Sequence, residues 1–130
     1  MRGKPECIIA DWLGYAKNDL DTAQKLLQVG GWPAATAFHA QQSAEKGIKA
    51  LLIRYGVQPS KTHDIASLLR YCETEVGIAI EELKGAITLT PYAVEIRYPG
   101  RWPEVSQEEA TTAVAIAEEV LDKITKMLTG

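Results

Sequence analysis

Residues 32–55, WPAATAFHAQQSAEKGIKALLIRY, decide the fold of this chain. Pro33 suits the first position of a helix, because the N–H that proline lacks would have no partner there. Gly56 suits the position after the last turn, because glycine tolerates a left-handed backbone. Between them, apolar residues recur every three or four positions, as on one face of a helix: Ala37, Ala44, Ile48, Leu51 and Tyr55. The stretch is therefore predicted to be a single helix of about six turns.

This helix has two further faces. Small residues line one of them, so that another backbone can approach closely: Thr36, Ala40, Ser43, Gly47 and Ala50. The other face is polar and mixed in charge, and consists of His39, Gln42, Lys46 and Lys49 with Glu45 beside them. Gln41 interrupts the apolar face. An amide buried there costs on the order of 1–3 kcal/mol unless it is paired, so we expect a specific partner for it.

A second helix is predicted before this one. Residues 1–9 look like a short lead-in, and Asp11 is a candidate N-cap for a helix over 12–29. Gly30 and Gly31 end that helix. So short a connection favours an antiparallel pair of helices.

Two shorter helical segments are predicted after Gly56. Asp64 is a candidate N-cap for a helix that ends at Gly77. Residues 78–90 then show a helical pattern through Ile80, Leu83, Ala86 and Ile87. Pro91 interrupts this pattern, so a kink or a new start capped by Thr90 is expected there.

The last helix begins with a capping box. Ser106 at the cap and Glu109 three residues on can each satisfy a free backbone N–H, and the helix is predicted to run to about Leu128. No convincing strand pattern occurs in the chain. We therefore predict one all-α domain over residues 1–130, with its core over about 11–128. The expected architecture is an up-and-down bundle of four main antiparallel helices plus a short or kinked fifth.

The composition fits a globular protein, with 46% hydrophobic and 24% charged residues. A net charge of −3 argues against a broad basic face that grips nucleic acid non-specifically. The apolar runs are too short to span a membrane, and the N-terminus lacks the apolar core of a signal peptide. Cys7 and Cys72 are thus expected to be reduced thiols in the cytoplasm. His39 and His63 have no third ligand in the pattern, so neither a metal site nor a cofactor is expected.

Four segments resemble the HEPN family (higher-eukaryote and prokaryote nucleotide-binding domain). They are DWLGYAKNDLDTAQKLL at 11–27, AFHAQQSAEKGIKALL at 37–52, KTHDIASLL at 61–69 and EIRYPGRW at 95–102. The resemblance implies a small helical bundle that is usually a homodimer. It also implies a possible partner, since many members are encoded beside a small nucleotidyltransferase in toxin–antitoxin-like pairs.

A large subset of the family are metal-independent RNases, which use an Arg and a His a few residues apart. Arg97 matches the Arg, but residues 101–103 contain no His. RNA cleavage of this kind needs a general acid or base near neutral pH, and Arg does not release its proton. The resemblance therefore favours a module that binds a nucleotide, RNA or a nucleotidyltransferase over an enzyme.

Eight side chains are candidates for ligand binding: His39, Gln41, Gln42, Lys46, Lys49, His63, Arg97 and Tyr98. Arg97 can hold a phosphate with two donors, and Tyr98 can stack on a base. For Gln41, the alternative is a bond that ties a neighbouring helix near Tyr92 or Arg97.

The other candidates have plainer interpretations as well. His39 can hydrogen-bond locally, and His63 can fix its loop or reach across to the 32–55 helix. Lys46 and Lys49 can form a solvated helix face, or a cationic patch with the arginines near Arg97. Two alternative functions stay open: a divergent RNase that uses His39 or His63, and a purely structural dimerisation module.

Overall fold

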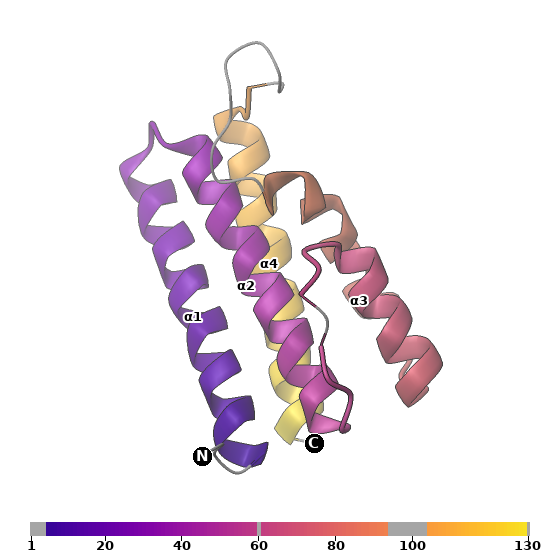
Figure 1. The fold of residues 1–130 in the computed structure, drawn as a ribbon. Coiled ribbons are helices and arrows are strands. Elements are labelled where there is room, and N and C mark those ends of the chain that lie inside the picture. Colours follow the sequence, from indigo (N-terminus) through magenta and orange to yellow (C-terminus); the bar gives the residue numbers. More distant parts are fainter. Residues whose placement is uncertain (1–4, 60, 94–103, 130) are drawn as a thin grey trace.

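The computed structural model describes residues 5–59, 61–93 and 104–129, and side chains from residue 8 onward (Figure 1). In these residues the chain is helical and contains no strand, which confirms the all-α class. The elements are α1 (Pro5–Val29), α2 (Pro33–Arg54), α3 (Ile65–Tyr71), a π-helical turn η1 (Cys72–Val76), a 3₁₀ helix η2 (Glu81–Ala93) and α4 (Gln107–Thr129).

Helix α2 lies at the centre of the bundle (Figure 1). In Figure 1, α1 covers one side of α2, α4 lies behind it, and α3 lies on the side away from α1. The chain reverses between α1 and α2 at Gly30 and Gly31, whose φ angles of 77° and 83° are left-handed. Helices α1 and α2 are therefore the predicted antiparallel pair, and α4 runs in the direction of α2 (Figure 1).

The predicted boundaries of α2 are confirmed. Pro33 is its first residue, and Gly56 follows its end with a φ of 78°. Tyr55 was expected in the core but is 47% exposed. The reason is that the helix ends at Arg54, so Tyr55 is the C-cap residue rather than part of the last turn.

The small-residue face of α2 packs against α4. A Cβ atom added to Gly47 would lie 3.2 Å from the Cδ1 atoms of both Leu121 and Ile124. Thr36, Ala40, Ser43 and Ala50 on the same face are also fully buried. The close approach that the small residues predicted is therefore confirmed.

The capping box of α4 is present. The Ser106 hydroxyl accepts a bond from the Glu109 N–H at 3.0 Å, and the Glu109 carboxylate accepts one from the Ser106 N–H at 3.3 Å. Each bond satisfies a backbone N–H that the first turn of a helix leaves without a partner. The capping box at 106–109 therefore predicted the start of α4 correctly.

The predicted start of α1 was wrong. The helix begins at Pro5 instead of about residue 12, and Asp11 lies inside it rather than at its cap. Proline suits a first helical position, and Ile8 and Ile9 continue the helix with half-buried side chains.

The second half of the bundle also differs from the prediction. The helix expected to end at Gly77 does end there, but its last turn is the π-helical η1. Helix η2 continues through Pro91 without a new start, and the Thr90 hydroxyl instead accepts a bond from the Ile65 N–H at 3.3 Å. Ile87, expected to face inward, is exposed.

Residues buried in and just before η2 follow a period of three: Ile80, Leu83, Ala86 and Leu89. Three residues per turn is the geometry of a 3₁₀ helix, in which every third side chain lies on one line. This spacing explains why Leu89 rather than Ile87 faces the core.

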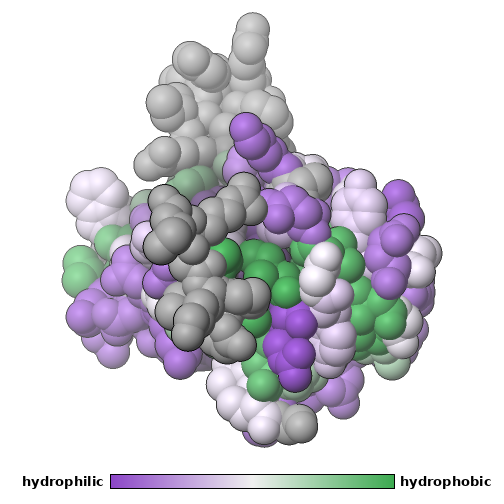
Figure 2. Space-filling model, turned by 60° about the horizontal axis from the view of Figure 1, so that its bottom comes forward, coloured by the Kyte–Doolittle hydropathy of each residue, from purple (hydrophilic) through white to green (hydrophobic). Residues whose placement is uncertain are grey.

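Figure 2 looks onto the end of the bundle where the two termini lie, and shows apolar patches bordered by hydrophilic side chains. Among the described residues, no helix is both long and apolar enough to cross a membrane. The thiol of Cys72 is in the core, as expected of a structural cysteine. The side chain of Cys7 lies outside the described part of the chain.

Candidate functional site

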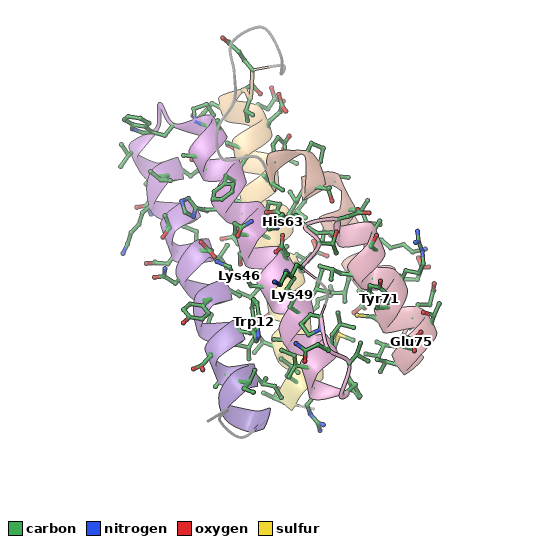
Figure 3. All side chains as sticks on the ribbon, in the orientation of Figure 1. Trp12, Lys46, Lys49, His63, Tyr71 and Glu75 are labelled. Carbon is green, nitrogen blue, oxygen red and sulfur yellow. The ribbon has the colours of Figure 1, made fainter. Side chains whose placement is uncertain are left out.

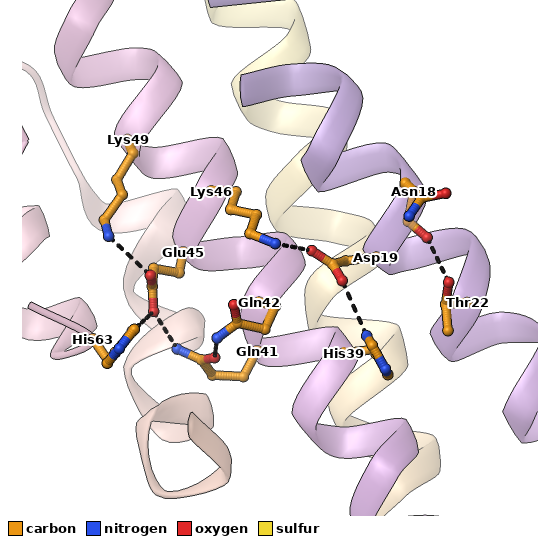
Figure 4. Close-up of polar contacts among 10 residues, drawn as sticks. All are labelled: Asn18, Asp19, Thr22, His39, Gln41, Gln42, Glu45, Lys46, Lys49 and His63. Atoms are coloured by element: carbon orange, nitrogen blue, oxygen red, sulfur yellow. Dashed lines mark hydrogen bonds and ion pairs between the residues drawn. The ribbon is translucent and has the colours of Figure 1, made fainter. Parts of the chain in front are cut away.

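Two buried carboxylates organise the polar side chains of α1 and α2. Glu45 is 2% exposed, and Asp19 on α1 is 7% exposed. A carboxylate that has lost its water needs donors in its place, since burying an unpaired charge is costly. Both carboxylates find these donors among the residues that the sequence singled out (Figure 4).

Glu45 accepts bonds from three side chains. Its Oε1 atom accepts from Gln41 Nε2 and from His63 Nδ1, each at 2.9 Å. Its Oε2 atom accepts from Lys49 Nζ, also at 2.9 Å. Gln41 and Lys49 lie one helical turn before and after Glu45, whereas His63 reaches it from the segment before α3.

This arrangement keeps Glu45 ionised. Burial alone would raise the pKa of Glu45, but the hydrogen bonds from Gln41, Lys49 and His63 and the charge of Lys49 together lower it below its ordinary value. An ionised carboxylate can only accept hydrogen bonds, so Nδ1 of His63 must carry the proton in this pair. In the neutral ring Nε2 is then an acceptor on the opposite edge.

Asp19 joins α1 to α2 in a similar way. Its Oδ2 atom accepts a bond from Lys46 Nζ at 2.6 Å, and its Oδ1 atom is 3.0 Å from His39 Nδ1. Lys46 and His39 are both half-buried. His39 therefore makes a hydrogen bond within the protein, which is the plainer of its two interpretations.

Gln41 has its expected partners, but not where they were expected. Its amide nitrogen donates to Glu45, and its oxygen accepts a bond from Gln42 Nε2 at 2.7 Å. Among the described residues these bonds stay within α2 and do not reach Tyr92, while Arg97, the other neighbour that was predicted, lies outside the described residues. The amide is satisfied by residues of its own helix, so its burial needs no ligand or partner chain.

The lysines do not form a solvated helix face, whereas the predicted cationic patch includes arginines that lie outside the described residues. Lys49 is only 6% exposed, and its ammonium group lies 2.9 Å from Glu45 and 5.7 Å from the centre of the Trp12 ring (Figure 3). Lys46 is likewise paired with Asp19. Each ammonium group is neutralised by a carboxylate of the bundle.

We call the group formed by His39, Gln42, Lys46 and His63 at the surface, with Asp19, Gln41, Glu45 and Lys49 buried beneath them, the α2 polar face. It gathers six of the eight predicted site residues. Arg97 and Tyr98, as well as the arginine at 101, lie outside the described residues.

Two contacts of the polar side chains were not predicted from the sequence: Asp19 with Lys46 and His39, and Trp12 with Lys49. Asp19 carried a usable signal, because it falls within the run of Ala16, Leu20 and Ala23 that faces the core. An acid at such a position predicts a buried pair. Trp12 carried no comparable signal, since its contact with Lys49 depends on how α1 and α2 are aligned.

Two hollows lie elsewhere on the surface. One, of about 450 Å³, lies between η2 and α4, and the other, of about 490 Å³, between α1 and α4. None of the predicted site residues lines either of them. In the described part of the chain, no three His, Cys, Asp or Glu side chains gather in a way that could hold a metal ion.

This helical fold and its polar network define a small α-helical domain, and comparison with known proteins identifies its family. The sequence model of the HEPN domain matches residues 9–128, so the chain belongs to the HEPN family. No curated protein matches it.

Two solved structures are similar over nearly their whole length. The crystal structure of TT1696 from Thermus thermophilus has a TM-score of 0.76 at 30% identity, over 91% of this chain and 96% of that one. The structure of ST0689, an archaeal HEPN homologue, has a TM-score of 0.73 at 25% identity, over 92% and 97% of the two chains. The resemblance found in the sequence is thus confirmed.

Proposed function

We propose that this chain is a nucleotide-binding and partner-binding module whose ligand contacts the α2 polar face. One observation carries the proposal: the outward-facing groups are held in fixed orientations by buried carboxylates. Glu45 accepts a hydrogen bond from Nδ1 of His63, so Nε2 on the opposite edge of this exposed imidazole is available to a ligand. Side chains fixed in this way lose little entropy on binding, which favours affinity.

Nucleotide binding is tested by isothermal titration with the four ribonucleoside monophosphates and triphosphates. We expect at least one of them to bind with a Kd below about 1 mM. His63→Ala should weaken that binding because the imidazole is lost, and Lys46→Ala should weaken it because the ion pair with Asp19 no longer ties α2 to α1. Lys84→Ala is the matched control, because Lys84 is also ion-paired but lies on η2. If no nucleotide binds, this function is excluded.

The partner in this proposal is a small nucleotidyltransferase, in a toxin–antitoxin-like pair, and the module itself is a cytoplasmic homodimer. These features are supported by membership of the family. A small nucleotidyltransferase encoded next to this chain should co-purify with it after co-expression, and light scattering should give twice the chain mass. A monomer that does not retain the nucleotidyltransferase would contradict both points.

A second candidate function is RNA cleavage by a route that does not need a histidine after Arg97. It is favoured by the two histidine–carboxylate pairs, His63 with Glu45 and His39 with Asp19. A carboxylate on Nδ1 fixes the tautomer in which Nε2 can take up a proton, as a general base requires. Purified protein would then cut single-stranded RNA in the presence of EDTA, and His63→Ala or His39→Ala would abolish cutting. Unchanged cutting in both variants would exclude this route.

A further inference from the structure

The α2 polar face carries no net charge among the described residues that form it. Its cations, Lys46 and Lys49, lie 2.6 Å and 2.9 Å from the carboxylates of Asp19 and Glu45. A phosphate that approaches this face therefore meets ammonium groups that are already paired. Breaking such a partly buried pair to bind phosphate would leave a carboxylate without its counter-ion, which is costly.

An exposed aromatic ring borders the same face. Tyr15 is 61% exposed and lies on α1 between Trp12, which contacts Lys49, and Asp19, which contacts Lys46. Residues three and four apart share one face of a helix, so Tyr15 projects from the α1 edge that carries these two contacts. In the described part of the chain, its ring stacks on no other ring.

Gln42 offers a hydrogen-bonding edge on the same surface. One N–H of its amide is used by Gln41. The second N–H and the amide oxygen have no bond within the described residues. An adjacent donor and acceptor of this kind match the edge of a nucleobase, and adenine, with its N6 donor and N7 acceptor, fits a glutamine amide best.

We propose that the ligand of this face is recognised through its nucleobase, which stacks on Tyr15 and is read by Gln42, and not through its phosphate. This inference rests on the proposed nucleotide-binding function and specifies its ligand. Stacking on an aromatic side chain suits a face without net charge, because every base has a π surface. The side chains that contact the base come from α1 and α2, so the α1–α2 hairpin forms the site.

The test compares each ribonucleoside with its 5′-monophosphate by isothermal titration at 50 and 200 mM salt. We expect adenosine to bind most tightly, and within about threefold of AMP, because the phosphate adds little. Raising the salt should change either Kd by less than about twofold, whereas binding of AMP through its single phosphate group would weaken severalfold, because salt screens the charges.

Variants separate the base contacts from general effects. Tyr15→Ala should weaken adenosine binding about tenfold, whereas Tyr15→Phe, which keeps the ring, should bind like the wild-type protein. Gln42→Ala should reduce the preference for adenosine over the other nucleosides. Lys61→Ala is the control for charge, because Lys61 is an exposed cation two residues before His63. It should leave nucleoside binding unchanged.

The results that overturn the inference are distinct from those that overturn the proposed function. If AMP binds and adenosine does not, or if Tyr15→Ala binds as well as Tyr15→Phe, recognition through the base is wrong while nucleotide binding stands. If neither nucleosides nor nucleotides bind, both proposals are wrong. Circular dichroism of each variant shows whether the fold is kept.

Discussion

At the scale of single residues, Glu45 is the group on which the α2 polar face depends. Glu45→Ala would leave Lys49 buried without its counter-ion, and we expect a loss of about 3–5 kcal/mol in the free energy of unfolding. Urea denaturation followed by circular dichroism measures this loss. The double variant Glu45→Leu with Lys49→Met should recover part of it, because apolar side chains of similar volume can replace a buried ion pair while the amide of Gln41 still lacks its acceptor.

The control for this prediction has the same spacing on an exposed surface. Asp21 and Lys25 are also four residues apart and 3.0 Å from each other, but both side chains are mostly exposed. Water screens such a pair, so Asp21→Ala should cost less than about 1 kcal/mol. Equal losses in Glu45→Ala and Asp21→Ala would show that burial does not strengthen the dependence of Lys49 on Glu45.

The lowered pKa of Glu45 also makes a prediction about pH. A carboxyl group whose pKa is lower in the folded chain than in the unfolded chain stabilises the fold above its ordinary value of 4.5. That contribution is lost as the pH falls below 4.5 and through the lowered pKa. The difference in unfolding free energy between the wild-type protein and Glu45→Gln should therefore shrink as the pH falls below about 4.5. A difference that grows in acid would contradict the sign.

At the scale of elements, the contact between α2 and α4 depends on the absence of a side chain at Gly47. A leucine there would meet Leu121 and Ile124, whose Cδ1 atoms lie 3.2 Å from the position of its Cβ. We expect Gly47→Leu to destabilise the protein by about 1–3 kcal/mol in urea denaturation. Gly14→Leu on α1 is the matched control, because a Cβ at Gly14 meets nothing within 4 Å. It should be neutral, or stabilise by up to about 1 kcal/mol through helix propensity.

Helix boundaries are the features of the elements that local sequence patterns predicted best. The ends of α2 and the start of α4 follow from Pro33, Gly56 and the box at Ser106, each of which satisfies a backbone requirement on its own. The buried side of η2 could also have been predicted, since its buried residues and Ile80 before them recur every third position. An α-helical period selected Ile87 in place of Leu89, so the error came from the period assumed and not from missing information.

At the scale of the whole molecule, the helical class and the family could be predicted from the sequence, but the hydrogen bonds that connect the α2 polar face to other elements could not. Gln41, Glu45 and Lys49 are spaced by four residues, so their contacts follow from the sequence of α2 alone. The bonds from Asp19 to Lys46 and from His63 to Glu45 cross between elements. Periodicity assigns a residue to a face of its own helix, and only packing decides which neighbour that face meets.

Cys72 tests whether the bundle opens as one unit. Burial raises the pKa of the Cys72 thiol to about 11, so at pH 8 roughly one thiol in a thousand would be the reactive thiolate even if the reagent had access. Cys72 lies in a core cluster that includes Ile48 of α2, Leu69 of α3 and Leu83 of η2. Because this cluster is continuous, exposing the thiol should require global unfolding.

The measurement is the rate of thiol labelling in Cys7→Ser, at pH 8 and in increasing urea below the unfolding transition. We expect the free energy of opening to fall with urea at the slope of global unfolding. As a control, a cysteine in place of the exposed Thr74, with both natural cysteines replaced by serine, should label at the rate of a free thiol. A much shallower slope for Cys72 would instead mean that α3, η1 and η2 detach from α2 while the α1–α2 hairpin and its polar face stay folded.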